Sequence, residues 1–268
     1  MKRDIAIFTI VKNEPYFLPK WIEYYSKSFD KRDMYVLDNE STDGSTNNLC
    51  VNVEKVITAS VNPNNLNYIW ITDVVKAQFQ KLLNSYNYVF YVDVDEFVIS
   101  TETPNLRNYL DRQIAEGRKC FISNGWFLIH YPEKNEIGFD YNKSMLSQRQ
   151  YAYQFNHYDK PFCANYFLDF AAGQHFAHTE LPYSSTRRTD PEILLLHAKL
   201  FDMEYSVNRY KQQMHMFDQI EPGVFDNDHH WIIKKEYDSF LDYHYKHRFD
   251  DTVEHLEQLL HYDYTNLF

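Results

Sequence analysis

The sequence predicts an α/β fold, with a mostly parallel central sheet flanked by helices and a helical C-terminal extension. Each of three apolar runs, at residues 5–11, 34–37 and 88–92, is continuous rather than alternating, which is typical of a strand buried on both faces. Apolar side chains within 17–25 and 71–82 recur at helical spacing instead. Strands that alternate with helices in this order indicate right-handed βαβ units.

The composition limits the class of protein. A chain of 268 residues, 44% of them hydrophobic, is long enough for one domain with a sizeable core. The net charge of −11 argues against general nucleic-acid binding, which needs a basic surface. The chain has only 6 glycines and no G-x-G-x-x-G or Walker pattern, which argues against a glycine-rich phosphate loop.

The cysteines and the apolar segments bear on the compartment. Cys50, Cys120 and Cys163 are isolated and lack C-x-x-C spacing, which argues against a disulfide framework or a zinc site. The N-terminus shows no signal-peptide pattern, and no apolar stretch reaches the ~20 residues that span a bilayer. We therefore expect a cytoplasmic protein without a transmembrane segment, and contact with the inner face of a membrane stays open.

Short polar loops separate the elements of the first half. Pro15 suits the first turn of the helix that follows the first strand. The loop at 38–45 contains a glycine turn, and its Ser45 is able to cap a following helix. A short third strand is expected at 55–58, before the helix at 71–82.

The second half is less regular. Its expected elements are a helix at 104–115, strands at 119–130, 162–171 and 192–196, and helices at 203–216, 231–244 and 250–261. No internal repeat or linker interrupts the chain, so the two halves are expected to pack as one domain.

Two carboxylates follow the strand at 88–92. Alternate residues of a strand point to the same side, so Asp93 and Asp95 are expected to address one divalent ion. Hard oxygen ligands suit Mg²⁺ or Mn²⁺, which keep open positions for substrate phosphates. The alternative is a strand followed by an acidic turn.

Polar residues also follow the first two strands. A carboxylate at the end of the second strand of a βαβ unit, here Asp38, accepts hydrogen bonds from a ribose hydroxyl or a base N–H. Asn13 and Glu14 would lie beside Asp38 if the first two strands are neighbours. The alternatives are a helix cap with a turn at Asp38, and an ordinary loop that caps the helix at Glu14.

These three segments together resemble a known family. The residues at 9–14, 37–45 and 91–97 resemble the motifs of family-2-like glycosyltransferases with the GT-A fold, in the branch with K-N-E and D-x-D-E-F motifs. Trp21 and the pair Tyr24-Tyr25 also fit that branch. The motif match covers about the first 130 residues. Many relatives have two adjacent acidic residues where this chain has Asp38-Asn39, which leaves the fine contacts of the pocket open.

The resemblance implies roles for individual residues. Asp38 would contact the donor nucleoside, and the side chains or backbone of four residues would flank it: Thr9, Val11, Asn13 and Glu14. Asp93 and Asp95 would bind the metal and the diphosphate, and Lys76 would reach toward the donor from its helix. In similar enzymes a late H-x-K segment completes the metal shell or contacts the diphosphate, which implies these roles for His197 and Lys199. The alternative for His197 is an ordinary hydrogen-bonded residue.

The acceptor side is less defined. An inverting transferase needs a base for the acceptor hydroxyl, and the sequence leaves four candidates open: Asp169, His175, His178 and Glu180. The face of Trp126 is expected either to form the floor of the acceptor site or to pack in the core.

The resemblance thus implies a metal-dependent glycosyltransferase of polysaccharide biosynthesis. It would use Mn²⁺ or Mg²⁺ and a nucleotide-diphospho-sugar, and would glycosylate a hydroxyl of a glycan or lipid-linked glycan, with inversion. Residues 1–200 would be the catalytic domain, with a donor half at 1–100 and an acceptor half at 101–200, and 201–268 the helical extension. The alternatives are a non-catalytic binding module of this fold and a nucleotidyltransferase, although the glycine-rich loop of the latter is missing.

Overall fold

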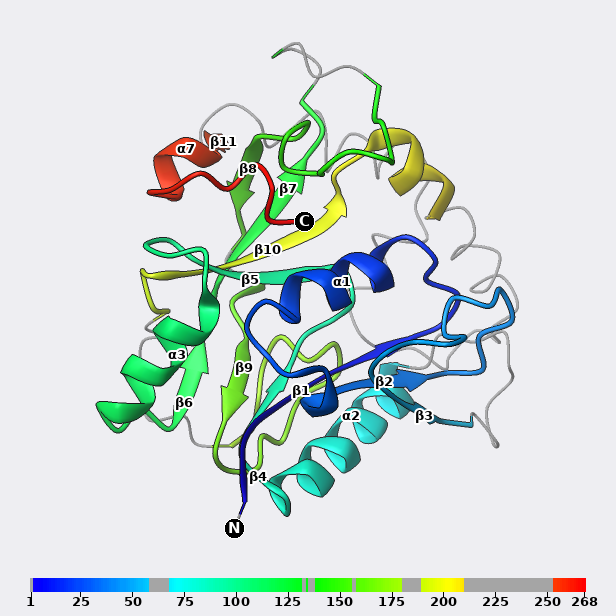
Figure 1. Cartoon of the computed structure of the whole chain (residues 1–268), viewed down its shortest axis with the longest axis vertical. Coiled ribbons are helices and arrows are strands. Elements are labelled where there is room, and N and C mark those ends of the chain that lie inside the picture. The colour runs from blue at the N-terminus through cyan, green and yellow to red at the C-terminus, as the bar shows by residue number, and fades with distance from the viewer. Residues whose placement is uncertain are drawn as a thin grey trace.

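Two β-sheets with helices packed on them make up the computed structural model (Figure 1). It describes residues 2–57, 68–131, 134, 138–155, 158–179, 189–209 and 253–268. The α/β class expected from the sequence is confirmed.

The first sheet contains the parallel strands expected from the first half of the chain. Its order is β3 (Asn52–Lys55), β2 (Met34–Asp38), β1 (Arg3–Val11), β4 (Tyr86–Tyr91), β9 (Pro161–Ala164) and β6 (Cys120–Ile122). The first four strands in this order run parallel, whereas β9 is antiparallel to both β4 and β6. The antiparallel edge comes from the second half of the chain, which the sequence left less regular.

The second sheet lies beyond the end of β4. Its order is β11 (Val253–His255), β8 (Tyr151–Gln154), β7 (Asn124–Ile129), β10 (Ile193–Leu200) and β5 (Glu96–Ser100). The single strand expected at 119–130 is two strands in different sheets, β6 and β7. They separate at Ser123, whose backbone N–H and side chain both donate to the carbonyl oxygen of Lys160.

Helices cover both faces of β1. Helix α1 (Phe17–Tyr25) lies between β1 and β5, and the hydroxyl of Tyr24 donates to the carbonyl oxygen of Val98 on β5 (Figure 1). Helix α2 (Tyr68–Leu83) packs on the opposite face, where Phe79 contacts Phe8. Because both faces are covered, β1 is apolar from Ile5 onward, with Thr9 as its one polar residue there.

Two further helices flank the sheets. Helix α3 (Leu106–Ala115) starts after the N-cap Asn105, whose side chain accepts from the backbone N–H of Arg107, and the 3₁₀ turn η1 (Lys31–Asp33) leads into β2. Residues 203–209 form a helical segment. The remainder of the expected helix at 203–216, and the whole of that at 231–244, lie outside the described residues.

Three expectations for local structure are wrong. The third strand is β3, three residues earlier than the expected 55–58. Residues 39–51 contain no helix for Ser45 to cap, and Ser45 instead donates to the Asp43 carboxylate from its backbone and its hydroxyl. In place of the expected helix at 250–261, the described residues form the strand β11 and then the short helix α7 (Leu256–Leu259). Strand β11 forms because it pairs with the edge of β8.

The C-terminus closes the core between the sheets. The ring of Phe268 stacks on Phe97 with centroids 3.9 Å apart, and the backbone N–H of Met145 donates to the carbonyl oxygen of Phe268. Phe268 is only 3% exposed. The last residues are thus part of the fold.

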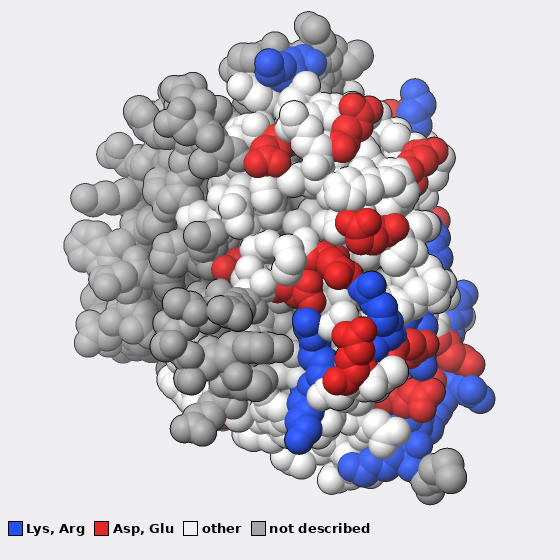
Figure 2. Space-filling view, turned by 90° about the vertical axis from the view of Figure 1, so that its left-hand side faces the viewer, with Lys and Arg blue, Asp and Glu red and all other residues white. Residues whose placement is uncertain are grey.

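The surface carries mixed charges. Figure 2 shows Lys and Arg side chains interspersed with Asp and Glu over the lower part of one face, so the described residues there form no extended basic surface. Among the described helices, none combines the length and apolar character required to cross a membrane.

Candidate functional site

The three motif segments meet at one edge of the first sheet. Strand β1 lies between β2 and β4, with Val11 opposite Asp38 and Phe8 opposite Tyr91. Because the strands are parallel, the residues that follow each of them lie at the same edge, where ligands bind in open α/β sheets. The neighbouring positions expected for these segments are confirmed.

Asn13 and Asp38 shape the loop at 39–46. Asn13 has a φ of +55° and its side-chain oxygen accepts from the backbone N–H of Thr42 at 2.8 Å. Asp38 accepts from the backbone N–H of Ser41 and the hydroxyl of Thr46, both at 2.9 Å. Burial acts to raise the pKa of Asp38, but these hydrogen bonds outweigh it and lower that pKa. Asp38 is thus an ionised residue that organises a turn, and its contact with a nucleoside stays a prediction.

Thr9 and Val11, near the end of β1, were also expected to flank the donor nucleoside. Thr9 is fully buried, and its hydroxyl has no hydrogen-bond partner among the described residues. The carbonyl oxygen of Val11, by contrast, accepts from the backbone N–H of Asn39.

Asp93 and Asp95 have different partners within the protein, and their binding of one ion stays a prediction. Strand β4 ends at Tyr91, so both aspartates lie in the turn before β5, where the alternation of a strand no longer applies. Asp93 accepts from the Tyr91 hydroxyl at 2.5 Å, whereas Oδ1 of Asp95 lies 3.4 Å from Nε2 of His197.

A fully buried lysine holds this turn. The ammonium of Lys160, just before β9, lies 2.5 Å from the Glu96 carboxylate and 3.6 Å from that of Asp93. Burial opposes the charged lysine, but the carboxylates outweigh it and raise the pKa of Lys160. Glu96 also accepts from the backbone N–H of Asp93 at 2.8 Å, so Lys160 and Glu96 together fix the acidic turn.

Arg209 joins the first and third motif segments. Its guanidinium lies 2.5 Å from the Glu14 carboxylate and 4.0 Å from that of Asp95. Burial raises the pKa of Glu14 to about 7, although Arg209 favours its charged form. Burial also opposes ionisation of Asp95, but His197 and Arg209 outweigh it and hold the pKa of Asp95 well below its usual range.

Aromatic rings surround His197 and bring one base candidate near it. The ring of His197 stacks on Phe127 at 5.1 Å and contacts Tyr158 at 4.9 Å. Tyr158 in turn contacts the ring of His175 at 4.2 Å. His175 is therefore one ring away from the pair formed by Asp95 and His197.

Two of the other base candidates have different partners, and the third lies outside the described residues. Asp169 forms a 2.6 Å ion pair with Lys76, which lowers the pKa of Asp169 and occupies both side chains. His178 is exposed, and its ring contacts Phe176 at 5.2 Å. Glu180 lies outside the described residues.

Asp95 and His197 are the pair best suited to hold a divalent cation. In the described part of the chain, no three His, Cys, Asp or Glu side chains converge as a metal site, so the expected set of Asp93, Asp95 and His197 is not assembled. A carboxylate oxygen and an imidazole nitrogen 3.4 Å apart still fit Mn²⁺ or Mg²⁺, which take further ligands from substrate oxygens and water. The Nδ1 atom of His197 is buried and has no hydrogen-bond partner among the described residues.

Comparisons with known proteins give a loose structural likeness. No protein-family model matches the sequence, and no curated protein matches it. A mannosyltransferase from Pyrobaculum calidifontis, solved with GDP-Man and Mn²⁺, aligns at 12% identity and a TM-score of 0.39, over 82% of this chain and 63% of that one. A CMP:2-keto-3-deoxy-manno-octonic acid synthetase complexed with CTP aligns at 7% identity and a TM-score of 0.31, over 69% of each chain. Both TM-scores are below 0.5, so neither alignment assigns a function to this chain.

The structure adds one residue to those predicted from the sequence and distinguishes between the alternatives for two others. Lys160 was missed, because a lysine before a short strand gives no signal of burial. The sequence alone leaves Arg209 open between a phosphate contact and a solvated face, and in the structure it bridges two motif segments. Trp126 is 5% exposed and belongs to the core, so core packing is the alternative that the structure adopts.

Proposed function

We propose that this protein is a glycosyltransferase that uses a nucleotide-diphospho-sugar donor and glycosylates a hydroxyl of a glycan or glycoconjugate. The observation that supports this most is the meeting of three motif segments at one sheet edge, together with the contact between Asp95 and His197. The acidic and basic side chains there suit a donor that carries both a sugar and a diphosphate.

Basic side chains at this edge suit the diphosphate. Arg209 lies beside Asp95. Lys199 is also near Asp95: burial lowers the pKa of Lys199, and the Asp95 carboxylate opposes that shift. In this arrangement the Arg209 guanidinium is paired with Glu14. A diphosphate would compete with Glu14 for Arg209, and protonation of Glu14 near neutral pH would favour the diphosphate.

Asp95 and His197 would hold the Mn²⁺ or Mg²⁺. A cation bound there would neutralise the negative charge that develops on the leaving diphosphate. Lys160 and Glu96 would keep the turn that carries Asp95 in place for this role.

The transfer needs one displacement at the anomeric carbon. The acceptor hydroxyl forms a new C–O bond to that carbon, the bond from that carbon to the phosphate oxygen breaks, and the nucleoside diphosphate leaves. Attack from the face opposite the leaving group gives inversion. The hydroxyl proton passes to a base, and His175 is the candidate whose position beside Tyr158 favours this role.

The test is a screen of nucleotide-sugars for hydrolysis and transfer with Mn²⁺. Asp95→Asn should reduce turnover by about 100-fold or more, the scale seen when a group that stabilises developing charge is removed. Asp4→Asn is the matched control, because Asp4 lies at the opposite end of β1 in an exposed ion pair with Arg107. Unchanged turnover in Asp95→Asn would exclude this role for Asp95.

The same protein distinguishes the alternative of a non-catalytic module. Calorimetric titration of UDP and GDP, with and without Mn²⁺, measures nucleotide binding independently of catalysis. Metal-dependent binding without turnover of any nucleotide-sugar would favour the module over the enzyme.

A further inference from the structure

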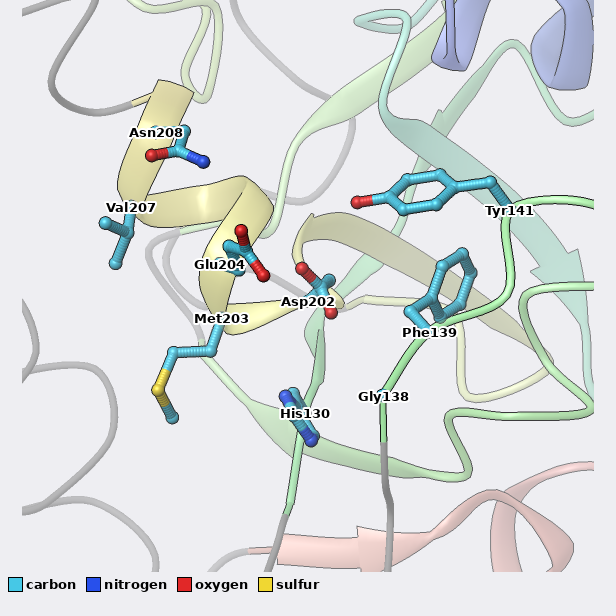
Figure 3. Close-up of a pocket in the computed structure, with 9 residues that line it drawn as sticks. All are labelled: His130, Gly138, Phe139, Tyr141, Asp202, Met203, Glu204, Val207 and Asn208. Atoms are coloured by element: carbon cyan, nitrogen blue, oxygen red, sulfur yellow. The ribbon is translucent and has the colours of Figure 1, made fainter.

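A cavity of about 490 Å³ lies beside the helical segment at 203–209 (Figure 3). This volume falls within the roughly 300–1,000 Å³ typical of small-molecule sites. Its described lining residues are His130, Gly138, Phe139, Tyr141, Asp202, Met203, Glu204, Val207 and Asn208. We call it the 202–208 cavity.

One wall of the 202–208 cavity is aromatic. The rings of Phe139 and Tyr141 lie 5.1 Å apart at 79°, and Tyr141 is 48% exposed. Figure 3 shows the Tyr141 ring extending toward the helical segment, with Phe139 beside it. Tyr16 contacts the Tyr141 ring at 5.1 Å, and Phe201 contacts Phe139 at 4.7 Å, so packing from behind holds this wall.

The facing wall is polar and acidic. Asp202 is held by the backbone N–H of Tyr205 at 2.8 Å and by the Arg149 guanidinium at 3.4 Å, which fixes the position of its carboxylate. Glu204 and Asn208 project from the helical segment on the same side of the cavity (Figure 3). Asp202 and Glu204 are the charged residues among the described lining, and their carboxylates suit hydroxyl donors better than phosphates.

The same helical segment reaches the ionic site. Asn208 lines the cavity, and the next residue, Arg209, contacts Glu14 and Asp95. The hydroxyl of Tyr205 accepts from Arg209 at 3.3 Å, and its ring packs on Phe201. One short segment therefore lines the cavity and also supplies Arg209 to the site that contains Glu14 and Asp95.

We propose that the 202–208 cavity binds a neutral saccharide that serves as the acceptor. This inference rests on the proposed glycosyltransferase function. The C–H face of a pyranose ring lies on the exposed, electron-rich ring of Tyr141, with the perpendicular Phe139 ring at its edge, and its hydroxyl groups donate to the Asp202 and Glu204 carboxylates. The Asp202 and Glu204 carboxylates favour the acceptor over the donor in this cavity, because they repel the anionic donor and accept hydrogen bonds from the hydroxyl groups of the acceptor.

The test measures saccharide binding without any donor. Methyl glycosides of neutral hexoses are titrated into the full chain and followed by ligand-observed NMR, with methyl glucuronide as the anionic comparison. At least one neutral glycoside should bind, and the glucuronide should bind more weakly because of Asp202 and Glu204. Absence of binding by every neutral glycoside would overturn the proposal.

Substitutions then locate the binding site. Tyr141→Ala should weaken binding of the neutral glycoside by about tenfold, which corresponds to about 1.4 kcal/mol. Tyr141→Phe keeps the ring and should bind as the wild type does, and Phe176→Ala removes a ring of similar exposure, 43%, outside the cavity. Equal binding by Tyr141→Ala and wild type would overturn the proposal. Glu204→Lys provides a second test, because reversing this charge should strengthen glucuronide binding relative to the neutral glycoside.

Donor hydrolysis distinguishes this inference from the proposed function. If Tyr141→Ala raises the acceptor KM but leaves donor hydrolysis without acceptor unchanged, both are supported. If the donor is hydrolysed but Tyr141→Ala leaves the acceptor KM unchanged, the cavity assignment is wrong and the enzyme assignment stands. If no donor is turned over while glycoside binding depends on Tyr141, the saccharide site stands and the enzyme assignment fails.

Discussion

The carboxylate of Asp95 lies 3.4 Å from Nε2 of His197, although the two residues come from distant parts of the chain. Antiparallel pairing of β5 with β10 places His197 opposite Glu96, directly after Asp95. The contact therefore depends on the second sheet starting where the first sheet's acidic turn ends. Any role of the D-x-D-E segment then involves β10 as well as β4.

His197→Ala should weaken Mn²⁺ binding in the presence of UDP or GDP by about 10–100-fold. The substitution removes the imidazole, which is one of the two groups proposed to coordinate the cation, and leaves only the Asp95 carboxylate. Calorimetry measures the change. His261→Ala is the control, since His261 is 58% exposed and pairs with Glu102 away from this contact. Equal weakening in both variants would mean that His197 has no particular role in cation binding.

Glu14 should give the protein a pH-dependent stability. Burial raises its folded-state pKa to about 7, above the ordinary value of 4.5, so the folded protein binds the proton more tightly than the unfolded chain. The free energy of unfolding should thus fall as pH rises from about 4.5 to about 7, by about 1–3 kcal/mol from this group.

Urea unfolding at a series of pH values measures that slope. Glu14→Gln should flatten it, whereas Glu23→Gln, at an exposed position of α1, should leave it unchanged. Donor affinity should follow the same titration, rising as pH falls through about 7 because protonated Glu14 releases Arg209. An unaltered slope in Glu14→Gln would exclude Glu14 as its source.

The sequence predicted the elements that depend on local pattern. Strands β1, β2 and β4 and helices α1 and α2 come from continuous apolar runs and helical periodicity, and their parallel order brought Asn13 and Asp38 together as expected. The sequence could not predict which strands form the second sheet, since that depends on pairing between distant segments. Lys160 precedes β9, which joins the first sheet antiparallel to β4, and Arg209 follows β10 of the second sheet, so both positions also depend on pairing between distant segments.

Phe268 should contribute strongly to stability despite being the last residue. Its ring is 3% exposed and stacks on Phe97, so Phe268→Ala should lower the free energy of unfolding by about 3–5 kcal/mol. Phe176→Ala, at a ring that is 43% exposed, should cost about 0.5 kcal/mol or less. Thermal unfolding of the two variants compares these values, and similar losses would show that the C-terminal ring is not anchored in the core.

The contributions of Lys160 and Glu96 to stability should be coupled, because removing either one leaves the other as a buried charge without its partner. Lys160→Met alone should lower the free energy of unfolding by about 3–5 kcal/mol, and Glu96→Gln alone should also destabilise the fold. The double variant should lose less than the sum of the two, since neither charge then stays buried alone. A double-mutant cycle by urea unfolding measures the difference. Purely additive losses would contradict a direct interaction between Lys160 and Glu96. They would also mean that other contacts hold the turn that carries Asp95.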